Sequence, residues 1–74
     1  MNKFDLEKKL KEMNIDERAY CLNGGLPNEC YTLDHIGNKW FVYYSERGEM
    51  SDKKSFDTEE LACQYFLELL SSNF

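Results

Sequence analysis

A tight chain reversal between two β-rich segments constrains this sequence more than any other feature. The segments Glu29–Ile36 and Lys39–Glu46 flank the dipeptide Gly37-Asn38. Glycine at the first central position fits a two-residue type II′ turn, because that position requires a positive φ. The turn fixes the register. It predicts cross-strand pairs of His35 with Trp40, Leu33 with Val42 and Tyr31 with Tyr44 on one face, and of Asp34 with Phe41, Thr32 with Tyr43 and Cys30 with Ser45 on the other.

The two faces of this hairpin differ in polarity. The face that carries Leu33 and Val42 is the larger and more apolar one, so we expect it to line the hydrophobic core. If the helices of the protein cover that face, Phe41 and Tyr43 are left partly exposed on the opposite face. The alternative is that segment 19–22 or a chain terminus folds over these two rings.

Helical periodicity predicts a first helix over residues 3–13. Asn2 is suited to cap its N-terminus, and Asn14 is suited to end it in the left-handed region. Phe4 is expected to pack where the helix begins. The apolar face of this helix consists of Leu6, Leu10 and Met13.

A second helix is predicted over residues 57–71. Asp57 is the expected N-cap, with Glu60 three residues later as the second half of a capping box. Phe56 and Leu61 are expected to contact each other across this cap. The apolar arc of the helix consists of Leu61, Ala62, Tyr65, Phe66, Leu69 and Leu70.

A third, more polar strand is predicted within Glu49–Phe56, after a reversal at Arg47-Gly48. A plain two-residue turn would direct Ser51 and Lys53 at the core, so the sequence predicts a β-bulge or a longer loop. Polar, lysine-bearing strands are typical of sheet edges. Residues 19–22 are suited to add a short further strand.

These elements predict one α+β domain over residues 1–74, in the order α-β-β-β-α. Its three-stranded antiparallel sheet, with a short fourth strand as an addition, has both helices packed on one face. A chain of 74 residues buries only about 60% of its unfolded surface, which leaves little room for a deep site with supporting groups. We therefore expect a binding module that is not an enzyme and takes no cofactor.

The charge excess is acidic and lies in the later part of the chain. The sequence has 14 acidic and 9 basic residues, for a net charge of -5, and the two signs cancel within residues 1–18. Nucleic-acid binders need a basic surface to replace phosphate counterions. The excess argues against such a partner and favours a basic protein. An acidic rim is expected around the hairpin, formed by Glu29, Asp34, Glu46, Glu49 and Asp52.

The residues able to carry chemistry form no recognisable motif. His35 is the only histidine, and packing against Trp40 explains it better than a role as base or metal ligand. Its odd offset from Cys30 points the two side chains to opposite strand faces, so no metal site is expected. With no signal peptide or membrane-length apolar run, we expect a cytoplasmic protein with reduced cysteines and no membrane contact.

Three stretches carry a family resemblance. They are a glycine turn at Asn23–Glu29, an aromatic strand and turn at Lys39–Gly48, and a capped helix start at Phe56–Cys63. In them the chain resembles small bacterial immunity proteins of polymorphic-toxin and contact-dependent inhibition systems, over about residues 16–70. The resemblance implies a cytoplasmic antidote that binds and blocks a cognate toxin domain.

The predicted element order also resembles the double-stranded-RNA-binding domain. That family places lysines at the start of its last helix, toward phosphate. Here Asp57, Glu59 and Glu60 occupy that position, so the similarity is one of architecture. An RNA-binding module remains the alternative, as does a homo-oligomeric structural module, a homodimer for example, that uses the Phe41–Tyr43 face or Leu67.

The sequence thus predicts a toxin-neutralising binding protein whose partner is a basic toxin domain. Aromatic side chains on the outer hairpin face would anchor the partner, and carboxylates would steer it. The predicted contact residues are Asp34, Phe41, Tyr43, Glu29, Glu46 and Glu49.

Overall fold

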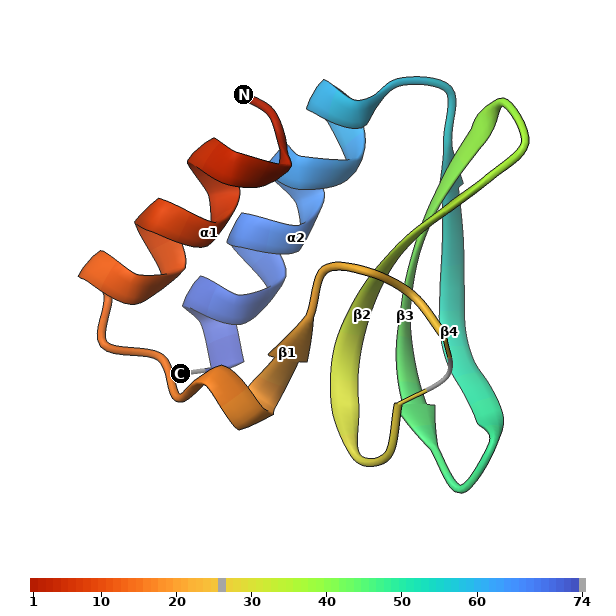
Figure 1. The fold of residues 1–74 in the computed structure, drawn as a ribbon, viewed down its shortest axis with the longest axis horizontal. Helices are drawn as coiled ribbons and strands as arrows, with labels where there is room; N and C mark the ends of the chain where they lie inside the picture. Colours follow the sequence, from red (N-terminus) through yellow and green to blue (C-terminus); the bar gives the residue numbers. More distant parts are fainter. Residues whose placement is uncertain (26, 74) are drawn as a thin grey trace.

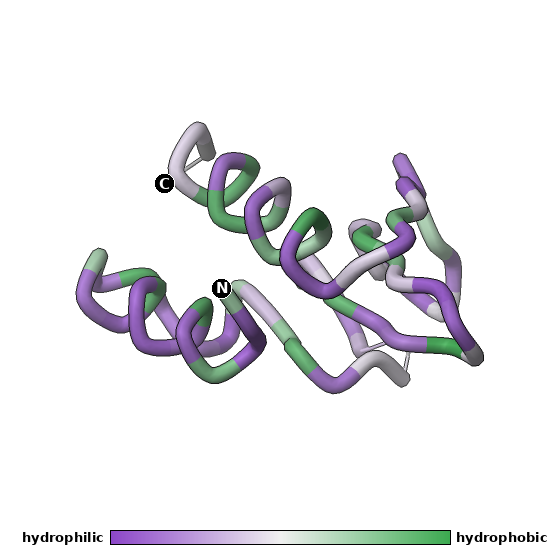
Figure 2. The backbone as a smooth tube through the Cα atoms, turned by 90° about the horizontal axis from the view of Figure 1, so that it is seen from above, coloured by the Kyte–Doolittle hydropathy of each residue, from purple (hydrophilic) through white to green (hydrophobic). Residues whose placement is uncertain are grey.

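A computed structural model describes residues 1–25 and 27–73. It is a four-stranded sheet with the strand order β1-β2-β3-β4 and with both helices on one side (Figures 1 and 2). All neighbouring strands are antiparallel except β1 and β2, which are parallel. The elements are α1 (Lys3–Glu12), a 3-10 turn (Glu17–Ala19), β1 (Tyr20–Cys21), β2 (Cys30–Ile36), β3 (Lys39–Glu46), β4 (Glu49–Phe56) and α2 (Glu59–Asn73).

The predicted hairpin is confirmed. Each predicted pair of β2 and β3 occurs, from Cys30 with Ser45 to His35 with Trp40. Gly37 takes a φ of +61°, whereas Asn38 is not among the residues with positive φ, as a type II′ turn requires. The short additional strand expected within residues 19–22 is β1.

The connection of β3 to β4 combines a two-residue turn with a β-bulge, which the sequence predicted as alternatives. Arg47 and Gly48 have φ values of +50° and +79° and form a two-residue turn that pairs Glu46 with Glu49. A bulge follows at Asp52, whose φ is +53°, and the register shifts there. After the shift Lys54 lies opposite Val42, so Lys53 is turned away from the helices.

The face assigned to the interior is confirmed as the core. Leu33 and Val42 are buried and pack with Leu6 and Leu10 of α1 and with apolar residues of α2. Helix α1 packs beside α2, and α2 contacts the sheet. The remaining buried members of this cluster are Ile15, Tyr20, Leu22, Ala62, Cys63, Phe66 and Leu70.

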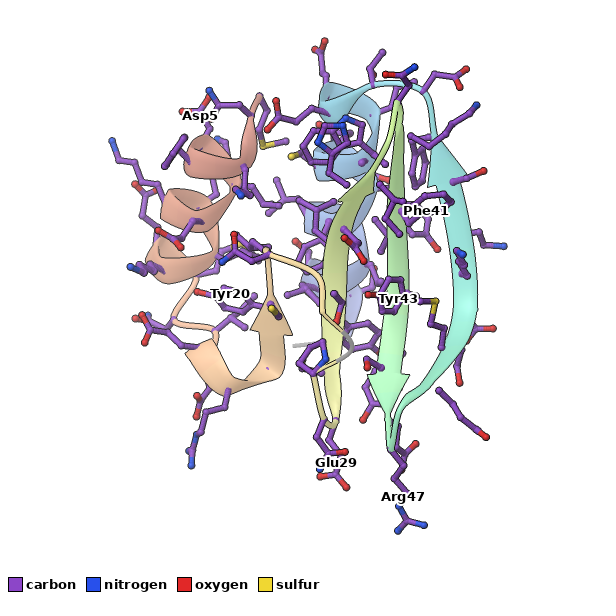
Figure 3. The ribbon with its side chains drawn as sticks, turned by 45° about the vertical axis from the view of Figure 1, so that its right-hand side comes forward. Asp5, Tyr20, Glu29, Phe41, Tyr43 and Arg47 are labelled. Atoms are coloured by element: carbon purple, nitrogen blue, oxygen red, sulfur yellow. The ribbon has the colours of Figure 1, made fainter. Side chains whose placement is uncertain are left out.

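The opposite face of the sheet is covered around Tyr43. The sequence had left open whether this part of the face is exposed. Tyr43 is only 1% exposed, and Thr32 and Ser45 are fully buried. The connection between β1 and β2 passes in front of β2 and β3 in Figure 1, and Figure 3 shows α2 on the other side of the sheet. Residues 23–25, 27 and 28 of this connection are called the strap below. The expectation of a partly exposed Tyr43 is therefore wrong, and the cover is this strap instead of segment 19–22 or a terminus.

Hydrogen bonds to β2 and β3 hold the strap against the sheet. The Ser45 hydroxyl donates a hydrogen bond to the Pro27 carbonyl oxygen. Gly24 is buried, and its N–H donates to the Leu33 carbonyl at 3.0 Å. A Cβ atom at Gly24 would lie 2.2 Å from Oδ1 of Asp34, so only glycine fits against that carboxylate.

The helix ends differ in part from the prediction. Asn2 caps α1 in a capping box with Asp5, and Asn14 takes a left-handed φ of +59°, both as expected for these asparagines. Phe4, however, is 77% exposed, so it does not pack at the helix start. Its position faces away from the side that carries Leu6.

Helix α2 is capped by Thr58 instead of Asp57. The Thr58 hydroxyl accepts the Leu61 N–H at 3.2 Å, while the Asp57 carboxylate pairs with Lys39. Leu61 is 55% exposed, so its expected contact with Phe56 is wrong. Phe56 packs on Tyr65 instead, at a centroid distance of 5.3 Å.

Substitution of Gly24 tests the strap. The added methyl group must displace Asp34, and alanine is strained at a φ of +65°. Gly25→Ala is the matched control, because its φ is +84° but nothing lies within 4 Å of its Cβ position. We expect a loss of roughly 1–2 kcal/mol from the backbone strain in both variants, and about 1–3 kcal/mol more in Gly24→Ala. Urea denaturation measures both; equal losses would contradict the close packing of strap and sheet.

Candidate functional site

The structure divides the six predicted contact residues into two groups. Asp34, Phe41 and Tyr43 lie on the outer sheet face, opposite the helices. Glu29, Glu46 and Glu49 lie at the end of the sheet that carries the Arg47-Gly48 turn, where Figure 3 shows Glu29 and Arg47 together.

The Tyr43 and Asp34 side chains serve the packing of the outer face. The buried Tyr43 hydroxyl donates to Oδ2 of Asp34 at 3.0 Å. The other oxygen of Asp34 accepts the His35 N–H at 2.8 Å. Each carboxylate oxygen therefore accepts one hydrogen bond within the protein, and the Tyr43 ring is too deeply buried to offer a partner a surface.

The part of the outer face that stays open is apolar and basic. Phe41 is half-buried, and the Lys53 ammonium lies 4.4 Å from the centre of its ring. Ile36 on the same face is 54% exposed. Asp34, the cross-strand partner of Phe41, is half-buried and bonded to Tyr43, so this face is less acidic than the docking surface that the sequence predicted.

The acidic groups gather instead at the turn end of the sheet. Glu46 and Glu49 are exposed and lie directly opposite each other. Glu29, directly before β2, and Asp52, at the bulge of β4, are also exposed. Within residues 1–25 and 27–73, none of these carboxylates forms an ion pair. We call these residues the acidic end.

Strand alternation places two of these carboxylates on the helix side. Glu46 follows Tyr44 by two residues, so both side chains project from the same face of β3. Glu49 is the cross-strand partner of Glu46 and shares that face. The acidic end therefore continues the face that carries the tyrosines, beyond the region that the helices cover.

A hollow of about 320 Å³ opens beside the acidic end, between the sheet and the later turns of α2. We call it the tyrosine hollow. Tyr31 and Tyr44 form one wall as an edge-to-face pair with centroids 5.0 Å apart. In the described part of the chain, the hydroxyls of Tyr31, Tyr44 and Tyr65 have no hydrogen-bond partner. The remaining lining consists of Val42, Tyr43, Asp52, Lys54 and Leu69.

Electrostatics couple the acidic end to the hollow. The pKa of Tyr44 is raised, first because its ring is desolvated and then because the carboxylates of Glu46 and Glu29 oppose a negative phenolate. These carboxylates therefore act on the wall of the hollow, and their field favours a cation there.

The sequence did not reveal the hollow because it predicted the tyrosines as core residues. Tyr31, Tyr44 and Tyr65 are only partly buried. The available signal was the polarity of β4, where Ser51 lies opposite Tyr44 and Lys54 opposite Val42. Neither side chain fills the space between Tyr44 and α2 with apolar atoms.

Other chemically capable residues are accounted for by packing. The His35 and Trp40 rings stack in parallel with centroids 4.0 Å apart, as expected. Among the described residues, no three histidine, cysteine or acidic side chains are placed to hold a metal ion. Burial raises the pKa of Cys63 to about 11 and also raises that of Cys30, which makes both thiols poor nucleophiles at neutral pH.

A titration tests the coupling of Tyr44 to the acidic end. Glu46→Gln removes the charge that raises the pKa of Tyr44 most, so we expect this pKa to fall toward the ordinary value of 10.0. In the wild type the folded state holds this proton more tightly than the unfolded chain. The resulting stability is present below pH 10 and is lost as the pH rises through the folded pKa. NMR titration of the ring measures the shift, with Glu12→Gln as the remote control; an unchanged pKa in Glu46→Gln would contradict the coupling.

Neither helix, within the described residues, is long and apolar enough to cross a membrane. Comparison with protein-family models, curated proteins and solved structures finds no match for the chain.

Proposed function

We propose that the protein is a non-catalytic immunity protein that binds and neutralises a cognate bacterial toxin domain. The observation that carries the proposal is the acidic end. Glu29, Glu46, Glu49 and Asp52 are exposed and have no ion pair in the described part of the chain.

Unpaired like charges facing each other cost stability, and this supports a role in recognition. Glu46 and Glu49 are direct cross-strand neighbours, an arrangement that destabilises a sheet when both residues carry the same charge. A basic partner surface relieves this repulsion when it docks. Relief of the repulsion between Glu46 and Glu49 thus contributes favourably to the binding free energy.

The docking surface we propose differs from the one expected from the sequence. It joins the acidic end to the tyrosine hollow on the helix side of the sheet and leaves out Asp34 and Tyr43, which serve the outer face. Tyrosine is enriched among residues that dominate binding energy, because its ring gives contact area and its hydroxyl a polar handle. The carboxylates steer a basic toxin into register.

The mode of inhibition follows from charge. A toxin domain that acts on nucleic acid carries a basic surface for phosphate. Glu46, Glu49 and Glu29 would occupy that surface and exclude the substrate. The neutralisation needs no chemistry from this chain, in keeping with its single small core.

The partner can be identified independently of the docking surface. The reading frame immediately upstream is expected to encode a large secreted protein with a variable C-terminal domain. Co-expression of that domain with this chain should yield a complex in which the toxin is inactive. A chain that elutes alone and does not protect cells that express the domain would contradict the proposed function. Sedimentation of the chain alone separates this proposal from a homo-oligomeric module.

Charge reversal tests the docking surface with the purified toxin domain. Glu46→Lys with Glu49→Lys should slow association by roughly tenfold or more at low salt and weaken its salt dependence. The matched control is Glu7→Lys with Glu12→Lys on α1, which changes the net charge equally at exposed positions. Stopped-flow kinetics measure both; equal slowing in the two double variants would show a net-charge effect and contradict docking at the acidic end.

A further inference from the structure

The tyrosine hollow has the walls of a site for a flat, cationic group. Tyr31 and Tyr44 meet at an interplanar angle of 66°, so the ring that presents its edge keeps both faces free of its partner. Tyr65 of α2 adds a third ring to the lining, and Leu69 adds an apolar contact. Aromatic faces attract cations through the negative charge of the ring face.

The electrostatic balance around the hollow is negative. The acidic residue Asp52 and the basic residue Lys54 lie in its lining and offset each other. Glu46 and Glu29 then act on Tyr44 at its edge, as the raised pKa of that residue reflects. Neither carboxylate is neutralised by an ion pair among the described residues.

We infer that the tyrosine hollow receives one basic side chain of the protein partner, an arginine, whose guanidinium lies among Tyr31, Tyr44 and Tyr65 and faces Glu46. The inference rests on the proposed function, because it names the chemical group by which the toxin domain would be anchored.

Arginine fits this site better than other occupants. Its planar guanidinium stacks on aromatic rings and has five N–H donors. These donors can reach tyrosine hydroxyl oxygens, which have no hydrogen-bond partner among the described residues, as well as the Glu46 carboxylate. An apolar side chain would leave the hydroxyls unsatisfied, and an anion would be repelled. The volume of about 320 Å³ suits one long side chain, being at the small end of ligand sites.

A model peptide tests the inference without the toxin. The probe is a blocked glycine peptide with one central arginine, and its control carries citrulline, which has the same shape and no charge. NMR follows the ring signals of Tyr31, Tyr44 and Tyr65 up to about 20 mM peptide, since contacts of this kind give dissociation constants on the order of millimolar. We expect salt-sensitive shifts of these rings with the arginine peptide and much smaller shifts with the citrulline peptide.

Two variants and a control locate the binding. Tyr44→Leu should weaken the binding of the arginine peptide by roughly two- to fivefold, which is the contribution of one exposed cation–ring contact. Lys54 is exposed and is the one basic residue in the described lining of the hollow. Lys54→Met removes this positive charge and should tighten binding of the arginine peptide by about twofold. Phe41→Leu changes the outer face and should have no effect. Lys54→Met keeps the test decisive if Tyr44→Leu proves unstable.

Four results would overturn the inference: equal shifts with both peptides, shifts that spare the three tyrosines, weaker binding in Lys54→Met, or no shift at all. None of these results bears on complex formation with the toxin domain or on the charge-reversal kinetics. The arginine site can therefore be disproved while the proposed function is upheld.

Discussion

The contact between the strap and the outer sheet face decides which surfaces of this protein are open. Gly24 lies against the Asp34 carboxylate, Asp34 accepts the Tyr43 hydroxyl, and Ser45 bonds to the Pro27 carbonyl. These contacts bury Tyr43, one of the two aromatic rings that the hairpin projects away from the helices. Because the strap covers the outer face around Tyr43, the surface that we propose for recognition lies at the turn end of the sheet and along β4, while Phe41 and Ile36 stay partly open at the other end of the sheet.

The polarity of β4 also decides which surface stays open, and the bulge at Asp52 sets which of its residues face the helices. Before the bulge Ser51 shares a face with Tyr44, and after it Lys54 shares a face with Val42. Only Phe56, at the end of the strand, contributes an apolar ring to the helix side, where it meets Tyr65. The sheet is thus sealed to α2 at one end and open at the other. The open end is where Tyr44 and Glu46 adjoin each other along β3.

Local chemistry determined how far the fold could be predicted. Gly37-Asn38 and the strict alternation of β2 and β3 specify a register, and that register was confirmed residue by residue. Predictions that required knowledge of competing partners were less accurate. Asp57 pairs with Lys39 and leaves the cap to Thr58, and Tyr43 bonds to Asp34 beneath the strap that precedes β2. The tyrosine hollow depends on where α2 passes over the sheet, which no local pattern encodes.

The central claim is that Tyr43 is closed off while Tyr31, Tyr44 and Tyr65 face solvent beside the acidic end. Photochemically induced dynamic nuclear polarisation tests it directly, because a dissolved dye enhances the NMR signals only of tyrosine rings that it can reach. The account predicts enhanced signals for Tyr31, Tyr44 and Tyr65 and none for Tyr43 or Tyr20, which are 1% and 8% exposed. An enhanced Tyr43 signal together with a silent Tyr44 would contradict it.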